Sequence, residues 1–239
     1  MAKTGAIRRR SSSAIDAGNM DRTERSKLQR RRDRGSHDWN VIYGILDSGF
    51  VAHVGFCVAD QMFVIPTMYG RDGRTLFLHG SVASRLLREL DRGIPICVTV
   101  TLIDGLVLSR SAFDHSMNYR SVVAFGRVQK VADREEKLAA LRLISEHLIA
   151  GRWSEVRAPS AKELNATTVL RFSIDEASSK VRSGPPQDEE SDLQHPVWAG
   201  VLPLEVSALP PIPDDKLCAG TPIPVYVLQY AARLRGEGK

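Results

Sequence analysis

The sequence predicts a mainly β (α+β) fold, a closed antiparallel barrel with inserted helices. Short apolar and β-branched runs follow one another through tight turn signals, as successive antiparallel strands do. About seven such runs are present, and closing them into a barrel removes their exposed edges. Strands and helices do not alternate one for one, which disfavours a doubly wound nucleotide-binding fold.

The first half of the chain is expected to hold one helix and three strands. Apolar residues at helical spacing predict a helix over 38–47, and Gly49 ends it. Two β-rich runs joined at Ala59-Asp60 predict a hairpin, and a turn at 70–73 would lead on by a meander. The strands are expected at 50–58, 61–69 and 75–79.

The second half continues this pattern with two helices and further strands. Ser81 is expected to cap the first helix, and Asp133 the second, which covers 134–149. Asp104-Gly105 is a strong hairpin signal. The strands are expected at 96–103, 106–110, 119–131 and 167–174.

Composition divides the chain into three parts. Residues 1–30 are expected to be a disordered basic tail, 31–184 the barrel domain, and 185–239 a Pro-rich extension that packs on the barrel or on a partner. Because the Arg-rich head carries most of the excess positive charge, the body has no general nucleic-acid surface. No run has the length of a membrane span, and no signal peptide is visible.

The three cysteines, Cys57, Cys97 and Cys218, are far apart and have no paired spacing. They fit reduced thiols in a cytoplasmic protein rather than disulfides or a zinc site. The histidines also lack metal-ligand spacing, so no metal is expected. No residue stands out as a catalytic nucleophile.

The polar run Asn118-Tyr119-Arg120-Ser121 stands directly before an apolar strand. Donors of different chemistry beside an apolar surface are typical of a ligand pocket. A polar loop that merely enters a core strand explains the same residues, and the two readings stay open.

A candidate anion site lies at a predicted strand-to-helix junction. Gly80 permits close approach, Ser81 and Ser84 offer hydroxyls, and Arg85 offers a charged fork of donors beside His79. Backbone N–H groups at the start of the helix also favour a phosphate. The alternative is a capped helix with a solvated arginine.

Two weaker candidates follow further along the chain. Lys180 and Arg182 alternate, so both would point to one face of a strand, toward an anion or toward water. Trp198 follows a proline and would either anchor the tail in a groove or stack on a flat ligand.

Taken together, these motifs resemble the pyridoxamine 5′-phosphate oxidase-like superfamily, in the branch with nitroimidazole-resistance reductases and flavin-nucleotide-binding proteins. The resemblance runs from about Arg25 to Val227. Its motifs are His79-Gly80-Ser81, the 96–101 strand, Asn118 to Val122 with Gly126, Ile65-Pro66-Thr67, Gly151-Arg152-Trp153, Lys180-Val181-Arg182 and Trp198-Ala199-Gly200.

The resemblance implies a split β-barrel of antiparallel Greek-key type that forms a homodimer and binds FMN at the dimer interface. It implies that 79–85 hold the FMN phosphate, that Pro66, Thr67, Val98 and Thr99 lie along the ring, and that 118–121 add further contacts. Lys180, Arg182 and Trp198 would contact the cofactor from the partner.

The function implied is an FMN-dependent oxidoreductase acting on a small molecule, with NAD(P)H as a possible electron donor. A flavin carries its own redox chemistry, so the lack of a protein nucleophile is consistent with this function. The pattern for binding pyridoxamine phosphate is missing, which argues against vitamin B6 synthesis. The alternatives are a flavin carrier or sensor without turnover, and a haem-binding protein on the same barrel.

Overall fold

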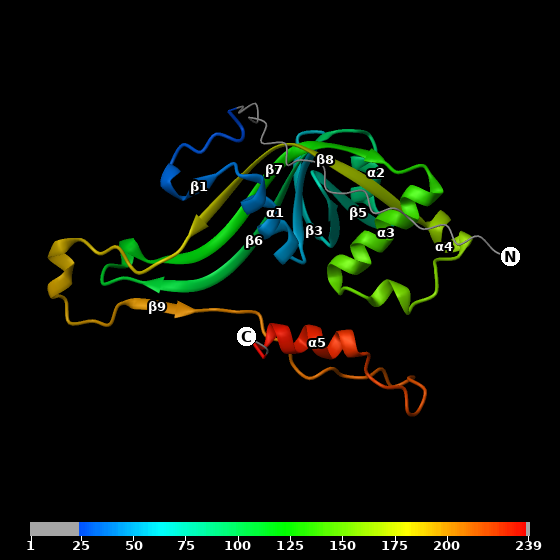
Figure 1. Cartoon of the computed structure of the whole chain (residues 1–239). Coiled ribbons are helices and arrows are strands. Elements are labelled where there is room, and N and C mark those ends of the chain that lie inside the picture. Colours follow the sequence, from blue (N-terminus) through cyan, green and yellow to red (C-terminus); the bar gives the residue numbers. More distant parts are fainter. Residues whose placement is uncertain (1–23, 238–239) are drawn as a thin grey trace.

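The computed structural model describes residues 24–237, and the nine strands in that range form one antiparallel sheet (Figure 1). The order is β3-β2-β6-β7-β8-β5-β4, with β1 added to β8 and β9 to β6. The strands are β1 (Gly35–Ser36), β2 (Ala52–Val58), β3 (Gln61–Thr67), β4 (Tyr69–Asp72), β5 (Thr75–Ser81), β6 (Pro95–Leu108), β7 (Ser116–Lys130), β8 (Thr167–Arg182) and β9 (Gly200–Pro203). The mainly β prediction is confirmed.

Five α-helices and four short 3-10 helices accompany the sheet in these residues. The α-helices are α1 (Trp39–Ser48), α2 (Arg85–Leu90), α3 (Arg134–Leu148), α4 (Ala161–Ala166) and α5 (Val225–Leu234). The 3-10 helices are η1 (Arg32–Arg34), η2 (Ala112–Asp114), η3 (Arg152–Ser154) and η4 (Glu190–Gln194). None of the helices described is long and apolar enough to cross a membrane.

The main core fills the inside of the barrel, and a smaller core lies outside it under α3. Alternation along the strands sends Leu76 and Leu78 of β5 inward and Phe77 outward. Phe77 packs with Ala140 and Ile144 of α3. One face of β5 therefore supports the barrel, while the other holds a helix against it.

Helices α1 and α3 form where the sequence predicts them. The carboxylate of Asp38 accepts a hydrogen bond from the backbone N–H of Asn40 at 2.8 Å, and that of Asp133 from Glu136 at 2.8 Å. Such caps satisfy backbone donors that have no partner within the helix. The hairpin of β2 and β3 is also confirmed, with Ala59 and Asp60 at φ 47° and 60° in its turn.

The predicted turn at 70–73 and the meander after it are wrong. Residues 69–72 form β4, and β5 pairs with β8 and β4 rather than with β3. Gly70 is a glycine for packing: a Cβ there would lie 2.6 Å from the backbone nitrogen of Ile144 in α3. The glycine that suggested a turn is required instead because helix α3 lies so close to it.

The predicted hairpin at Asp104-Gly105 is also wrong, because β6 continues through it. The register with β7 shifts between Ile103 and Gly105, which marks a bulge. The Asp104 carboxylate accepts two hydrogen bonds from Arg120 of β7, at 2.7 and 2.9 Å. Strand β9 pairs with the part of β6 beyond the bulge.

Strand β8 is twice as long as predicted and carries a bulge of its own. Asp175 is an extra residue between Ile174 and Glu176, which pair with adjacent residues of β7. Before the bulge the even-numbered side chains face the core, and after it Ala177 and Ser179 do. Lys180 and Arg182 therefore belong to the outer face of the sheet.

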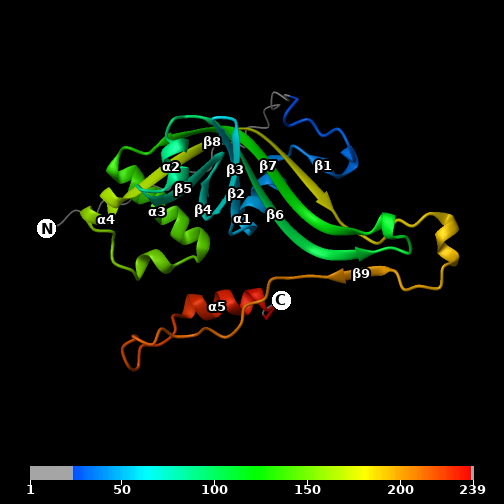
Figure 2. The same ribbon diagram turned by 180° about the vertical axis from the view of Figure 1, so that it is seen from behind.

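The N-terminal end of the described chain contacts the sheet, whereas helix α5 near the C-terminal end contacts the segment after α3 through Tyr226. Arg25 forms an ion pair with Glu176 of β8 at 2.6 Å, so part of the predicted tail contacts the sheet; residues 1–23 of that tail lie outside the described range. The C-terminal extension contains β9 and α5, and neither was predicted. Figures 1 and 2 both show α5 running beside the end of the barrel. The domain boundaries at 30 and 184 stay predictions.

Tyr69 offers a test of this core. Its buried hydroxyl lies 2.5 Å from the carbonyl oxygen of Leu46 and 3.0 Å from that of Gly49, at the end of α1. We expect Tyr69→Phe to lower the free energy of unfolding by about 1–3 kcal/mol, because both carbonyls lose the tyrosine hydroxyl, and only that of Gly49 keeps another side-chain partner in the described chain, His147 at 2.7 Å. The measurement is urea unfolding, with Tyr43→Phe as control, since no hydrogen bond of the Tyr43 hydroxyl is seen in residues 24–237. An equal loss in the control would contradict this account.

Candidate functional site

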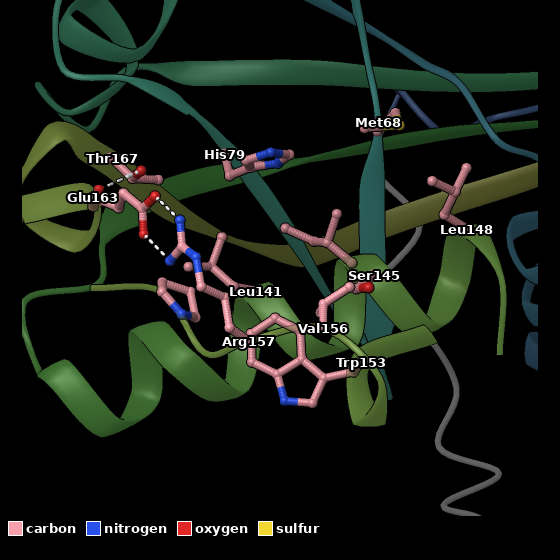
Figure 3. A pocket seen from close by; sticks show the side chains of 12 residues that line it. Met68, His79, Leu141, Ser145, Leu148, Trp153, Val156, Arg157, Glu163 and Thr167 are labelled. Carbon is pink, nitrogen blue, oxygen red and sulfur yellow. Dashed lines mark hydrogen bonds and ion pairs between the residues drawn. The ribbon is translucent and has the colours of Figure 1, made fainter. Parts of the chain in front are cut away.

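A pocket of about 560 Å³ lies outside the barrel, between β5, α3 and the segment from η3 to α4 (Figure 3). Its lining is mostly apolar, with a few polar side chains at defined places. The lining residues are Met68, His79, Leu141, Ile144, Ser145, Leu148, Trp153, Val156, Arg157, Pro159, Glu163 and Thr167.

The C-terminal end of α3 shapes one wall of this pocket. The two carboxylate oxygens of Glu146 accept hydrogen bonds from the backbone N–H groups of Gly151, at 2.8 Å, and Trp153, at 3.0 Å. Gly151 has φ 96°, which glycine adopts without strain. These contacts turn the chain back, so that the indole of Trp153 lies opposite His79 in the pocket (Figure 3).

An ion pair borders another side of the pocket. The Arg157 guanidinium donates to both carboxylate oxygens of Glu163, at 2.7 and 2.5 Å (Figure 3). This hydrogen bonding lowers the pKa of Glu163 to about 2. Glu163 also completes a capping box with Ser160 at the start of α4. The pair is exposed, so its role is to hold the border of the pocket in one arrangement.

His79 is the polar group that this pocket leaves unused. Its Nδ1 is buried and has no hydrogen-bond partner among the described residues. Burial lowers the pKa of His79 below its usual value, so the ring is neutral at pH 7. A neutral imidazole facing an apolar space can exchange a hydrogen bond with a ligand or bind a metal centre.

The predicted anion site around His79 is only partly assembled. Ser81 ends β5 and Ser84 precedes α2, so the predicted cap at Ser81 is wrong. A Cβ on Gly80 would lie 2.9 Å from Leu87, so this glycine serves the packing of α2. Ser84 makes no side-chain capping bond. The side chain of Arg85 lies outside the described part of the structure, and the phosphate site stays a prediction.

The four side chains of the polar run 118–121 have different surroundings. Asn118 is buried, donates to the carbonyl oxygen of Gly184 at 3.2 Å, and accepts from Arg182. Arg120 is paired with Asp104. Tyr119 and Ser121 remain half-buried on the outer face of β7. The contacts of Asn118 and Arg120 fit the structural reading of the run, and its role in ligand binding stays a prediction.

The predicted ring contacts fall on different faces of the sheet. Pro66 and Thr99 both pair with His53 of β2 and lie together on the outer face. Val98 is 1% exposed and packs inside the barrel, so its side chain cannot reach a cofactor outside. Thr67 is half-buried, and its hydroxyl donates to the carbonyl oxygen of Met68 at 3.2 Å.

Lys180, Arg182 and Trp198 have separate surroundings. Lys180 donates to the backbone oxygen of Arg30 at 3.3 Å, and Arg182 is buried at the end of β8. Trp198 is 68% exposed and lies over Gly200, so it does not anchor the extension in a groove of the described chain.

Strand β8 separates the two halves of the predicted site. His79 pairs with Val169 near one end of β8, whereas Ser121 pairs with Lys180 near the other. Eleven residues of strand correspond to about 36 Å, which is longer than FMN. One chain therefore does not bring 79–85 and 118–121 into one pocket.

Sequence reasoning missed most of the pocket lining. Trp153 was noticed only through the resemblance, and Glu146, Arg157 and Glu163 were not noticed. Ser160 and Glu163 do carry the S-x-x-E signature of a capping box, which predicts the start of α4. The contact of α3 with β5 is long-range and has no local signal.

The sheet order and the helix-covered pocket outside the barrel define the class of protein, an antiparallel split barrel. The family model described as pyridoxamine 5′-phosphate oxidase matches residues 38–181. The chain belongs to this family, which confirms the resemblance seen in its motifs. A search of curated proteins gives no match.

Solved structures give the same fold over most of the chain. The flavocytochrome Anf3 from Azotobacter vinelandii is 40% identical with a TM-score of 0.82, over 87% of this chain and 96% of that one. The FAD and heme binding protein from Mycobacterium smegmatis is 36% identical with a TM-score of 0.79, over 83% and 97%. A Bacteroides thetaiotaomicron protein provisionally assigned to 5-nitroimidazole antibiotic resistance is 25% identical with a TM-score of 0.53, over 62% and 86%.

Proposed function

We propose that the protein is a flavin-binding oxidoreductase, with FMN as its flavin, that acts on a small molecule as a homodimer. The observation that carries this proposal is the apolar pocket in which His79 Nδ1 is buried without a partner. A flat ring with a polar edge matches such a space, since a mostly apolar pocket with one placed polar group is the usual form of a cofactor site. Family membership and two relatives, a flavocytochrome and a FAD and heme binding protein, support a flavin.

Different residues of the pocket would make different contacts with the flavin. Leu141, Leu148 and Val156 exclude water, Trp153 offers an aromatic face, and His79 offers one hydrogen bond. Ser81 and Ser84, near the pocket, would contact the phosphate. The bound flavin would supply the electron or hydride transfer, which needs no protein nucleophile.

A second copy of the chain would complete the site. The outer face of the sheet carries Tyr119, Ser121 and Lys180 at the far end of β8. The same face leaves Met62 78% exposed and Val64 66% exposed, which is unusual unless a partner covers it. A dimer formed through this face would bring one chain's outer face to the other chain's pocket.

Haem is a second candidate group, favoured by the same histidine. His79 lines the apolar pocket, and a histidine imidazole is the proximal haem ligand of globins and peroxidases. Two relatives are described as a flavocytochrome and as a FAD and heme binding protein.

Absorption spectra and melting temperatures test these proposals together. Protein reconstituted with FMN, FAD or haem should show the bands of the group it binds. Flavin at one hundred times its dissociation constant adds about 2.7 kcal/mol of stability. This raises the melting temperature of a chain of this size by about 5–10 °C. No shift with FMN and a shift with FAD would correct the choice of flavin, and no shift with either would refute flavin binding.

The His79→Ala variant tests the pocket itself. We expect it to weaken flavin binding about tenfold, through loss of one hydrogen bond of about 1.4 kcal/mol. If haem binds here, its Soret band should shift or disappear. His195→Ala, an exposed histidine of the extension, is the control and should bind as the wild type does. Equal affinity in both variants would move the site away from His79.

Turnover separates an enzyme from a flavin carrier or sensor. NADPH or NADH added without oxygen should bleach the flavin of an enzyme, and a small-molecule acceptor should restore its colour. A flavin that stays oxidised under both donors would favour the carrier.

A further inference from the structure

A small polar pocket of about 260 Å³ lies at the other end of β8. Its walls come from the segment before β1, from the last residues of β8 and from the loop that follows. The lining residues are Asp33, Arg34, Val181, Arg182, Ser183, Pro185 and Gln187. It shares no residue with the pocket beside His79.

Arg182 is a buried cation with only neutral partners in the described chain. It is 6% exposed, and it donates to the side-chain oxygen of Asn118 and, at 3.3 Å, to the carbonyl oxygen of Pro185. Its Nε is buried and has no partner among these residues. A buried charge is costly unless an opposite charge compensates it.

Two further arginines add to this unbalanced charge. Burial lowers the pKa of Arg182, and the charges of Arg34 and Arg31 lower it further. The carboxylate that lines the pocket is that of Asp33, which lies 4.0 Å from Arg34 and is mostly exposed. Asp188, which follows Gln187, is already paired with Arg110 at 2.6 Å. Two guanidinium groups therefore line the pocket beside one carboxylate, and a third lies at its border.

The backbone holds Arg31 in an unfavourable conformation beside this pocket. Arg31 has φ 53° and ψ 55°, the left-handed region that side chains other than glycine rarely adopt. Its guanidinium donates to the side-chain oxygen of Gln187 at 2.7 Å. Residues held in strained conformations gather at ligand sites, because the surrounding structure must maintain them.

We propose that this pocket, which is lined by Arg34 and Arg182 and bordered by Arg31 through its hydrogen bond to Gln187, binds a phosphate group. Guanidinium forks match the oxygens of phosphate and pair with them in a bidentate way. Ser183 and the amide of Gln187 offer further donors. The volume is below that of sites for whole drug-sized ligands, so it suits one phosphate group, free or on a larger molecule.

Titration calorimetry of the full chain with inorganic phosphate tests this site directly. We expect saturable binding of one phosphate per chain, weakened at least tenfold in Arg34→Gln and in Arg31→Gln. Arg32→Gln is the matched control, because it removes the same charge from the same segment, but Arg32 lines a different pocket, whereas Arg31 donates to the lining residue Gln187. It should bind within about twofold of the wild type. Binding that does not saturate, or equal weakening in Arg32→Gln, would show diffuse charge attraction and overturn the site.

Melting temperatures give a second test, in which Arg34→Gln should raise the stability of the protein although it weakens phosphate binding. In buffer without multivalent anions, Arg34→Gln should melt above the wild type, because one repelling charge is gone. Phosphate should raise the melting temperature of the wild type and leave that of Arg34→Gln unchanged. A variant that melts lower without phosphate and still gains stability from it would contradict the proposed site.

Nucleotide ligands identify where the phosphate comes from. A preference for NADPH over NADH that disappears in Arg34→Gln would assign the pocket to the extra phosphate of NADPH. FMN binding that weakens in Arg34→Gln relative to riboflavin would assign it to a flavin nucleotide. Loss of inorganic phosphate binding alone would identify a free phosphate site. Inorganic phosphate contains no flavin, so a negative result here leaves flavin binding beside His79 untouched.

Discussion

Gly70→Val is expected to cost about 3 kcal/mol of unfolding free energy and most of the affinity for a ligand beside His79. Helix α3 lies directly on β4 at this glycine, where a Cβ would be 2.6–2.9 Å from the backbone of Leu143 and Ile144. Backbone atoms cannot rotate aside as a side chain can. The helix must therefore move away from the sheet, and it carries one wall of the pocket with it.

Urea unfolding and flavin titration measure the two effects of Gly70→Val. Gly44→Ala is the matched control, since nothing lies within 4 Å of a Cβ at that position in α1. This control should gain about 1 kcal/mol, because alanine favours a helix interior more than glycine does. A stable Gly70→Val protein with normal ligand affinity would show that the contact between α3 and β4 does not shape the pocket.

Glu146→Ala should lower the free energy of unfolding by about 2 kcal/mol and release Trp153 from the pocket wall. Both oxygens of this carboxylate are used, each by a backbone N–H of the turn that follows α3. Without them, two donors lose their partner and the turn loses what holds it against the helix. Ligand affinity should fall together with stability.

The Glu146→Gln variant should lie between the wild type and Glu146→Ala, because an amide keeps one acceptor oxygen. Glu135→Ala is the control, an exposed glutamate in the first turn of the same helix, and should cost under about 1 kcal/mol. Tryptophan fluorescence, compared before and after ligand addition, reports on the indole. An unchanged response in Glu146→Ala would mean that another contact holds Trp153.

Local sequence signals correctly predicted the helices and the hairpin that depend on residues close together in the sequence. Asp38 and Asp133 precede apolar positions at helical spacing, and both helices begin there. Ala59-Asp60 joins two β-rich runs, and the hairpin forms. In each case the residues that decide the structure lie within a few positions of one another.

Local sequence signals failed where the role of a residue depends on contact with a distant part of the chain. Gly70 must be a glycine because α3 packs against it, whereas the local sequence is typical of a turn. Asp104-Gly105 is a hairpin signal that becomes a bulge, because Asp104 pairs with Arg120 and β9 adds beyond it. Helix α5 follows Pro224, so the Pro-rich composition of the extension concealed it.

The candidate sites were predictable only in part for the same reason. His79 was predicted from its residue type and position and lines the pocket, whereas Tyr119 and Ser121 stay predicted site residues. The contacts of Asn118 with Arg182, and the approach of Arg34 to Arg182, join residues more than 60 positions apart. Sequence spacing holds no information on such distances, so it left open whether Arg182 meets an anion or faces water.

The extra residue Asp175 in β8 reverses which side chains of the strand face the core. Downstream of it, every inward position becomes an outward one. Deleting this single residue would send Lys180 and Arg182 toward the apolar interior and turn Ala177 and Ser179 to the outside. When this chain is aligned with relatives, a one-residue gap near Asp175 would therefore mark a protein whose outer face carries different chemistry, even where the overall identity is high.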